Sequence, residues 1–161
     1  MSEIDAWISQ LQCSENAEAR ADAAEELGEF GGEPAIAALI SALSDPSSTV
    51  QVSGVLALGE LRVLAAAETI ASFLSSSEPN LRGAAAVALG QIGGTEAAAL
   101  LMPLGADVSA AVRGATAWAL GTLGDLRAYD ALTRLSHDPD RDVAEAAQEA
   151  LQRIRKMGIG N

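Results

Sequence analysis

The sequence predicts an all-α fold, a right-handed α-solenoid of five helical hairpins. The first observation behind this prediction is a repeat, because a Leu-Gly pair returns every 31 residues along the chain. A fixed period of about 20 to 50 residues is the signature of a stacked-repeat array. The pairs are Leu27-Gly28, Leu58-Gly59, Leu89-Gly90 and Leu120-Gly121, and Leu151-Gln152 closes the series.

The composition is the second observation. The 161 residues are 49% hydrophobic but only 3% aromatic, so the core must be built mainly from alanine, leucine, valine and isoleucine. Alanine and leucine lead the helix propensity scale, and small side chains let helices approach closely. A chain of this length buries a sizeable core. Both facts favour helices stacked on helices over a sheet.

The first helix of each unit carries apolar residues at two positions three residues apart, which is the pattern of a buried helix edge. A short turn follows, clearest at Ser44–Ser48 and at His137–Asp140, where Asp, Pro and Ser supply turn geometry and an N-cap. The two columns are Ile8, Leu39, Ile70, Leu101 and Leu132, and Leu11, Ala42, Phe73, Leu104 and Leu135.

The second helix of each unit begins near an apolar column and ends at the repeated glycines. The column is Ala19, Val50, Leu81, Val112 and Val143. The Gly-x-x-Gly segments that follow lack the Lys-Ser or Lys-Thr of a phosphate-binding loop, so we interpret them as helix stops. Arg62 replaces the second glycine in unit two, and an altered connection is expected there. The segments are Gly28–Gly31, Gly90–Gly93 and Gly121–Gly124.

These signals predict one domain over residues 1–156, with a frayed tail at 157–161. The five units fall at about 1–32, 33–63, 64–94, 95–125 and 126–156. The expected helices are 3–12, 16–30, 33–43, 48–61, 64–74, 79–92, 95–105, 110–123, 126–136 and 140–156.

The charge distribution excludes some partners. The net charge is −12, and residues 1–33 contain nine of the 22 acidic residues but a single arginine. Such a chain repels a phosphate backbone, and no basic stripe is present, so nucleic-acid binding is not expected. The acidic residues serve solubility of one end of the array, or they attract a basic partner.

The remaining composition predicts a cytoplasmic protein. Cys13 is the only cysteine, so no disulfide forms within one chain, as suits a reducing compartment. The N-terminal residues lack the basic-then-apolar order of a secretory signal. The apolar runs are too short and interrupted to span a bilayer, so no membrane association is expected.

The repeat units resemble HEAT repeats. The resemblance rests on segments such as Asp107–Arg113 followed by Ala117–Gly121, and Glu33–Ile40, and the short glycine-punctuated form is similar to the subgroup named after phycobilisome lyases. It covers residues 1 to about 156. The resemblance implies the solenoid fold, but the same repeat occurs in adaptors, chaperones, lyase subunits and enzymes.

The resemblance also implies a ladder of ion pairs between units. HEAT families place an Asp at the turn between the helices and an Arg early in the second helix. Here the Asp column reads Ser14, Asp45, Ser76, Asp107 and Asp138, and the Arg column reads Arg20, Gln51, Arg82, Arg113 and Ala144. The ladder is incomplete. We expect Asp45, Arg82, Asp107 and Arg113 to be structural, with ligand contact as the alternative.

The candidate binding site is the exposed face of the second helices, which lines the concave surface in HEAT-like arrays. Its central positions are apolar and its ends are charged, as at Glu25 and Glu149. An exposed apolar strip with polar borders is typical of a protein-binding surface, and Trp118 is the expected anchor. The alternative is that curvature packs these side chains against neighbouring helices. The partner-binding candidates form a groove with Val52, Leu56, Ala84, Val87, Ala115 and Trp118 as its floor and Glu60 and Gln91 along one border.

No catalytic, cofactor-binding or metal-binding residues are expected. His137 is the only histidine, so a site built from several histidines is excluded, and the paired His-Glu motifs of HEAT-type deoxyhypusine hydroxylases are missing. His137 fits the favourable position for a histidine at a helix C-terminus. Cys13 has no histidine nearby in sequence to activate it. Trp7 is expected to cover the open end of the core.

The sequence therefore predicts a non-enzymatic scaffold or adaptor that binds a protein segment with basic flanks on its concave face. The alternative, suggested only by the repeat subgroup, is a bilin lyase or bilin-related chaperone subunit that acts with a partner chain. The two hypotheses differ in whether a linear tetrapyrrole binds.

Overall fold

The computed structural model describes residues 2–159 and is entirely helical over that range. Four short 3-10 helices accompany ten α-helices. The α-helices are α1 (Glu3–Cys13), α2 (Ala17–Phe30), α3 (Gly32–Ala42), α4 (Ser48–Glu60), α5 (Ala67–Ser72), α6 (Pro79–Ile92), α7 (Ala97–Leu101), α8 (Ala110–Leu123), α9 (Tyr129–Leu135) and α10 (Arg141–Ile159). The 3-10 helices are η1 (Leu64–Ala66), η2 (Phe73–Ser75), η3 (Met102–Ala106) and η4 (Leu126–Ala128).

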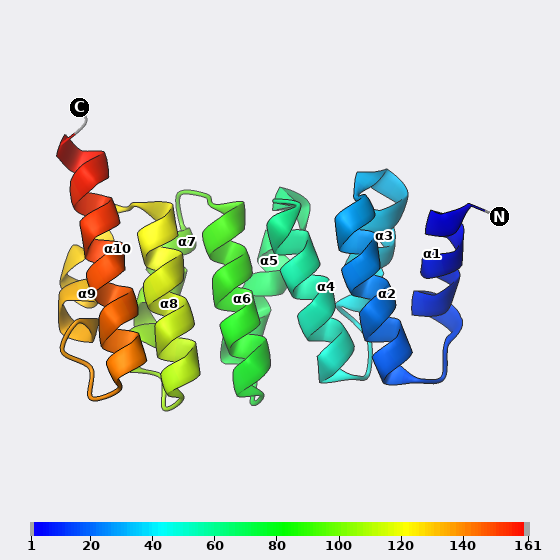
Figure 1. Cartoon of the computed structure of the whole chain (residues 1–161), viewed down its shortest axis with the longest axis horizontal. Coiled ribbons are helices and arrows are strands. Elements are labelled where there is room, and N and C mark those ends of the chain that lie inside the picture. The colour runs from blue at the N-terminus through cyan, green and yellow to red at the C-terminus, as the bar shows by residue number, and fades with distance from the viewer. Residues whose placement is uncertain (1, 160–161) are drawn as a thin grey trace.

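The helices form a two-layered row, which confirms the predicted α-solenoid. Figure 1 shows the second helices of the units, α2, α4, α6, α8 and α10, side by side along the row, with α3, α5, α7 and α9 in the layer behind them. The N-terminal and C-terminal ends lie at opposite ends of the row. Consecutive hairpins are therefore spatial neighbours, and residues that share a column lie along one face of the array.

Local signals set the helix starts. Ser2 and Asp5 form a reciprocal capping box at α1, and the Asn16 side chain accepts hydrogen bonds from the backbone N–H groups of Glu18 and Ala19 at α2. Pro79 occupies the first turn of α6, where its missing N–H costs no hydrogen bond. These caps explain why the predicted starts lie within a few residues of the observed ones.

The helix ends depend on residues in the left-handed region. Gly31, Gly93 and Gly124 have φ values of 64°, 80° and 67°. Arg62 keeps a positive φ of 52°, although its Cβ makes that conformation unfavourable. The expected altered connection is present at this point, because Val63 N–H bonds to Leu58 C=O and Arg62 N–H to Gly59 C=O, which is the Schellman pattern.

Two expectations about helix length were wrong. The predicted helices 64–74, 95–105 and 126–136 are each divided between an α-helix and 3-10 turns. At 95–105 the 3-10 helix begins at Met102, directly before Pro103, which cannot donate a backbone hydrogen bond. The tail was expected to fray from Met157, but α10 continues to Ile159. Residues 160–161 of the predicted tail lie outside the described residues.

The core runs between the two layers along the whole row. Its largest fully buried side chains come from both layers, and alanines fill the closest helix contacts. The predicted columns are confirmed by Leu39, Ile70, Leu101 and Leu132, which are all buried, whereas Ile8 is half-buried. Over residues 2–159, no helix is both long enough and apolar enough to cross a bilayer.

Candidate partner-binding face

The second helices of neighbouring units touch through glycine and alanine. At each of the four junctions a methyl group placed on the glycine would lie only 2.5 to 2.9 Å from the Cβ of an alanine in the next unit. The pairs are Gly28 with Ala57, Gly59 with Ala88, Gly90 with Ala119 and Gly121 with Ala150. These glycines lie inside their helices. They are therefore packing residues, and our interpretation of Gly28, Gly90 and Gly121 as helix stops was wrong.

This close contact determines which face is concave. The second helices of adjacent units pack on each other far more extensively than the first helices do. A two-layered row bends toward the layer whose members are more closely spaced. The second helices consequently form the inner side of the array, as the HEAT resemblance implied, and the candidate site lies on that side.

Three arginines join neighbouring units through paired hydrogen bonds to an aspartate. The Nε–Oδ2 distances are 2.7 or 2.8 Å, and Nη2 donates to Oδ1 of the same carboxylate. The guanidinium groups hold the pKa of all three aspartates below the ordinary value of 3.8. Each Nη1 also donates to a backbone carbonyl. The pairs are Arg20 with Asp45, Arg82 with Asp107 and Arg113 with Asp138. Because these groups are occupied within the chain, their geometry supports the structural role.

The missing ion pair belongs to one junction. Each arginine bonds to the aspartate of the following unit, so Gln51 and Ser76 are the two positions that would meet between units two and three. Both positions have lost the residue that forms the pair, since Gln51 stands in the arginine column and Ser76 in the aspartate column. Gln51 donates instead to the backbone carbonyl of Leu43, at 3.3 Å. The ladder is therefore interrupted at a single internal junction.

The predicted apolar strip lies on the second helices, where most of its members are half-buried. Val52, Leu56, Ala115 and Trp118 pack against the core with one side and keep part of their surface exposed. Val87 is half-buried as well. The side chains thus contact neighbouring helices and still present an apolar surface on the inner face, whose binding of a partner stays a prediction.

Two of the predicted strip residues are placed differently from the expectation. Ala84 is only 6% exposed, since it lies where neighbouring second helices meet, and it cannot form part of an exposed floor. The side-chain oxygen of Gln91 is buried close to Gly59 and has no hydrogen-bond partner among the described residues. Glu60 is exposed, as predicted for the border.

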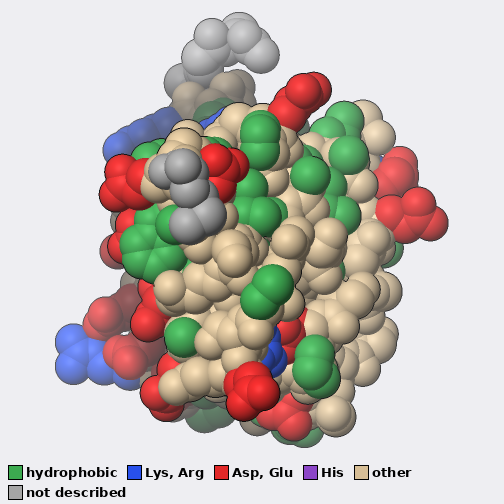
Figure 2. Space-filling view, turned by 90° about the vertical axis from the view of Figure 1, so that its right-hand side faces the viewer, with side chains coloured by type: hydrophobic (Ala, Val, Ile, Leu, Met, Phe, Trp, Pro, Cys, Tyr) green, Lys and Arg blue, Asp and Glu red, His purple; other side chains and the backbone are tan. Residues whose placement is uncertain are grey.

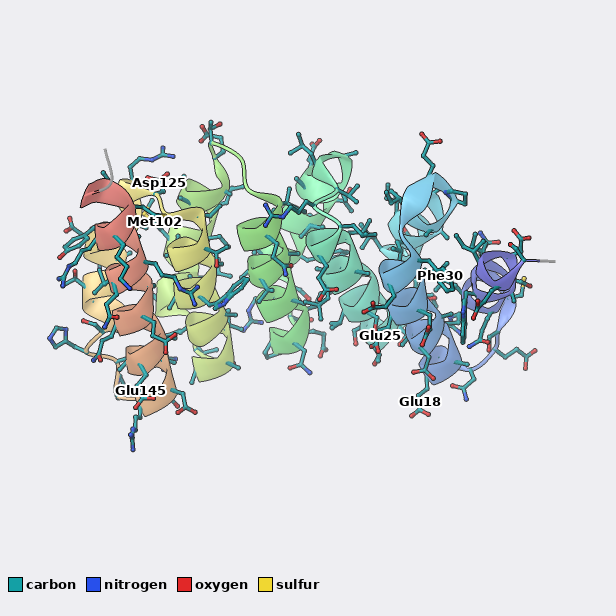
Figure 3. The ribbon with its side chains drawn as sticks, turned by 45° about the horizontal axis from the view of Figure 1, so that its top comes forward. Glu18, Glu25, Phe30, Met102, Asp125 and Glu145 are labelled. Atoms are coloured by element: carbon teal, nitrogen blue, oxygen red, sulfur yellow. The ribbon has the colours of Figure 1, made fainter. Side chains whose placement is uncertain are left out.

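An acidic pocket of about 250 Å³ lies between α2 and α4. We use the name acidic pocket for the set Glu25, Glu29, Ser53, Leu56, Ala57 and Glu60. Ser53 Oγ donates to Glu25 Oε1 at 3.0 Å, and Figure 3 shows Glu25 on α2. None of the three glutamates forms an ion pair over residues 2–159. The pocket therefore combines an apolar floor with uncompensated negative charge.

A second hollow extends the acidic pocket toward α6. It measures about 280 Å³ and shares Glu25 and Ser53 with the acidic pocket, while Val52 and Glu78 add to its lining. Seen from the α1 end, acidic side chains stand out along both sides of the molecule (Figure 2). The inner face at this end is thus acidic over more than one helix junction.

Sequence reasoning missed Glu25 and Glu29 as site residues. Both lie one unit before strip positions, because Glu25 shares a column with Leu56 and Glu29 with Glu60. We treated the charged ends of these columns as part of a generally acidic end, which serves solubility or attracts a basic partner, and named neither glutamate as a site residue. The signal that was available is the spacing of four residues between Glu25 and Glu29, which places both carboxylates on one face of α2.

The other candidates for chemistry remain isolated. No group of three or more His, Cys, Asp and Glu side chains suited to a metal ion occurs within the described part of the chain. His137 is exposed, and its Nδ1 lies 2.9 Å from the Thr133 carbonyl oxygen. Cys13 is exposed, and Trp7 packs against the core from α1 with its Nε1 buried.

Solved structures share this architecture. One is the complex of CpcE and CpcF of phycocyanin lyase from Nostoc sp. PCC7120, 24% identical over 99% of this chain and 67% of that chain, with a TM-score of 0.83. Another is a designed armadillo repeat protein in complex with the peptide (KR)4, 18% identical over 94% of this chain and 81% of that chain, with a TM-score of 0.69. At these identities the likeness shows the fold.

Sequence comparison gives the family. No curated protein matches this chain. The family model described as HEAT repeats matches residues 4–71, 39–110 and 67–152 in overlapping segments. Together these segments cover nearly the whole chain, in agreement with the stacked hairpins and the close contacts between second helices. The chain belongs to the HEAT repeat family.

Proposed function

We propose that this chain is a non-enzymatic interaction module whose concave face binds a basic segment of a partner protein. The observation that carries the proposal is the acidic pocket, in which Glu25, Glu29 and Glu60 line the space beside Leu56 and form no ion pair with any residue from 2 to 159. Unpaired carboxylates beside a partly apolar floor suit a lysine or arginine side chain, because its methylene stem is apolar and its end is charged.

The half-buried strip extends this surface toward the C-terminal units. Leu56, Val87 and Trp118 share one column at 31-residue steps, so they follow one another along the inner face. A bound segment that places its basic residues at the acidic pocket would place its apolar residues over this column. The designed armadillo protein bound to (KR)4 gives a precedent for a basic peptide on a similar solenoid.

The test uses fluorescently labelled (KR)4 peptide and measures its binding by fluorescence anisotropy. Glu25→Gln, Glu29→Gln and Glu60→Gln combined should weaken binding by about tenfold or more, because the local carboxylates are removed while shape and hydrogen bonding are kept. The wild-type affinity should also fall as salt is added, since the proposed contacts are partly exposed.

A matched control separates the pocket from the net charge. Glu33→Gln, Glu68→Gln and Glu96→Gln remove the same charge from exposed positions at the starts of first helices. This triple variant should bind (KR)4 nearly as well as the wild type. Equal losses in the two triple variants would show that the whole negative charge attracts the peptide and that the acidic pocket has no special role.

The apolar part of the proposal needs a second peptide, in which two leucines are inserted at the centre of (KR)4. The wild type should bind this peptide more tightly than (KR)4, and Trp118→Ala or Leu56→Asp should remove the gain, about 2 kcal/mol for a true anchor. Leu64→Ala is the control, because Leu64 is an exposed leucine in η1. Circular dichroism checks that the helices remain intact.

The proposal includes a cytoplasmic location and no cofactor. The exposed Cys13 is compatible with a reducing compartment, where a free thiol persists.

A second candidate function is a subunit of a bilin lyase. It is favoured by the likeness of nearly the whole chain to the complex of CpcE and CpcF of phycocyanin lyase. Absorbance spectroscopy with a linear tetrapyrrole distinguishes the two candidates. A shifted visible band that disappears in Trp118→Ala would favour the lyase subunit, and an unchanged spectrum would favour the interaction module.

A further inference from the structure

The outer layer contains a larger cleft that the concave-face proposal does not use. It lies between η3 and α9 and measures about 460 Å³, which is within the range of small-molecule sites. Figure 3 shows Met102, one of its lining residues, in the C-terminal half of the array. We name it the outer cleft, with Met102, Pro103, Gly105, Ala131, Arg134 and Leu135 as its central residues.

Gly105, which lines the outer cleft, stands in a column that holds leucine in the two preceding units. At steps of 31 residues the same column holds Leu43 and Leu74, and both are buried. Leu74 also lies in a 3-10 helix, as Gly105 does, so the local backbone type is shared. Units two and three therefore carry a buried leucine side chain at this position, and unit four carries none.

Nothing in the backbone or the packing requires a glycine at this position. Gly105 does not have a positive φ. A Cβ placed on it would meet Leu135 Cδ1 at 3.5 Å, which is ordinary van der Waals contact. This situation contrasts with Gly90, where an added methyl group would overlap a neighbouring helix. The empty space at Gly105 is therefore not explained by the needs of folding.

The first junction of the outer layer has a cleft at the same position in the repeat, which can be compared with the outer cleft. The corresponding cleft between α1 and α3 is formed by residues of the same columns, with Gln12 in place of Gly105, Ser41 in place of Arg134 and Ser44 in place of His137. It measures about 230 Å³, half the volume of the outer cleft. The fourth junction thus differs from the first in having more space, an arginine and a histidine.

The charge around the outer cleft is unusual for this acidic chain. Arg134 makes no ion pair or side-chain hydrogen bond within residues 2–159, so its guanidinium is available. The carboxylate of Asp138, which also lines the cleft, is occupied by Arg113. His137 directs Nδ1 to the Thr133 carbonyl, which leaves Nε2 available at the edge.

We propose that the outer cleft binds a small amphipathic anion, with its apolar part in the space left by Gly105 and its charged group at Arg134. Met102, Pro103 and Leu135 supply apolar contacts of the kind that line small-molecule sites. A flexible methionine adapts to the shape of an apolar ligand. An arginine that is free of carboxylates offers paired hydrogen bonds to a carboxylate or sulfonate.

The test uses 8-anilinonaphthalene-1-sulfonate, a fluorescent amphipathic anion, and its uncharged relative N-phenyl-1-naphthylamine. The wild type should show saturable fluorescence enhancement with both probes. Gly105→Leu should weaken both by about tenfold or more, because the added side chain would occupy apolar space in the cleft that Gly105 lines. Arg134→Gln should weaken only the sulfonate probe, since the apolar space is unchanged.

Two controls keep the result specific. Gln12→Leu adds a leucine at the corresponding position of the first junction and should leave the binding of both probes unchanged. Thermal unfolding of Gly105→Leu should show a midpoint at or above that of the wild type, because cavity filling adds apolar contacts. Unchanged probe binding in Gly105→Leu, or equal effects of Arg134→Gln on the two probes, would overturn the proposal.

Discussion

Single side chains decide how closely the second helices approach. A hydrogen atom at Gly90 allows the backbone of α6 to lie against Ala119 of α8, and the same contact recurs at each of the four junctions. The close approach makes the second helices the inner layer. The shape of the candidate binding face therefore depends on four glycines that are not at turns.

Gly90→Ala tests this role. The added methyl group would lie 2.7 Å from the Ala119 Cβ, so the helices must separate, and we expect a loss of about 1–3 kcal/mol in the free energy of unfolding. Urea denaturation followed by circular dichroism measures the change.

The same helix provides a control for that variant. Gly83 lies in α6, and a methyl group placed on it would meet Ala115 only at 3.9 Å. Gly83→Ala should therefore stabilise the protein by about 0.5–1 kcal/mol, the ordinary gain from removing a helix glycine. If Gly90→Ala were equally stabilising, the close contact would not be a constraint.

The wrong interpretation of these glycines as helix stops has a physical reason. A glycine near a helix end is usually a stop, and local pattern alone favours that interpretation. The contact that requires Gly28, Gly59, Gly90 and Gly121 comes from alanines 29 residues later in the chain. Only the arrangement of neighbouring units reveals it.

At the scale of elements, the ladder fixes each turn to the unit before it. The interruption at Gln51 and Ser76 leaves one junction without its ion pair, between the units that carry Leu56 and Val87. This junction lies beside the acidic pocket. The stability of this junction, compared with that of the other three junctions, therefore affects how the concave face adapts to a partner.

Restoring the missing pair should stabilise this junction. Gln51→Arg with Ser76→Asp recreates the geometry of Arg82 and Asp107, and we expect the double variant to raise the thermal midpoint by a few degrees at pH 7, with neither single variant doing so. Thermal unfolding of the four proteins measures the coupling. Additive single effects would show that the two side chains do not pair.

The stabilisation from the restored pair should also depend on pH, and it should be lost at low pH. In the existing pairs the arginine lowers the aspartate pKa below 3.8 in the folded state, so the unfolded chain binds protons more readily. The stabilisation by each pair is complete above about pH 3.8, and it disappears as the pH falls through the lowered pKa of the aspartate in the folded protein. The rise in the thermal midpoint of the double variant should likewise be present near neutral pH and be lost as the pH falls below about 3.8.

Element positions were largely predictable because helix starts and stops depend on local residues. Caps such as Asn16 and the first-turn Pro79 are visible in the sequence. The division of the later first helices into 3-10 turns was not predicted. In η3 it coincides with Pro103 in the first turn, and a period of apolar residues does not distinguish α-helix from 3-10 helix.

At the scale of the whole molecule, the array presents two different surfaces. Within residues 2–159, the inner face has carboxylates without ion-pair partners at Glu25, Glu29 and Glu60, and the outer layer has a cleft beside the guanidinium of Arg134, which also forms no ion pair there. The two sites therefore suit ligands of opposite charge. The division into five units within one domain, residues 1–156, stays a prediction, which the continuous core supports.

The candidate site was predictable in part. Columns at 31-residue steps correctly placed Leu56, Val87 and Trp118 on the second helices, because the repeat period fixes which residues share a face. The burial of Ala84 and the acidic pocket were not predicted. Both depend on the distance between neighbouring helices, which the glycine contacts set and the column pattern does not show.

The most direct test of the central claim is to map the bound peptide by nuclear magnetic resonance, using unlabelled (KR)4 and nitrogen-15 labelled protein. The account predicts that the largest amide shift changes occur in α2 and α4, around Glu25, Ser53 and Glu60, and that α3, α5, α7 and α9 change little. Changes concentrated on those first helices, or spread evenly over both layers, would contradict the proposed concave binding face.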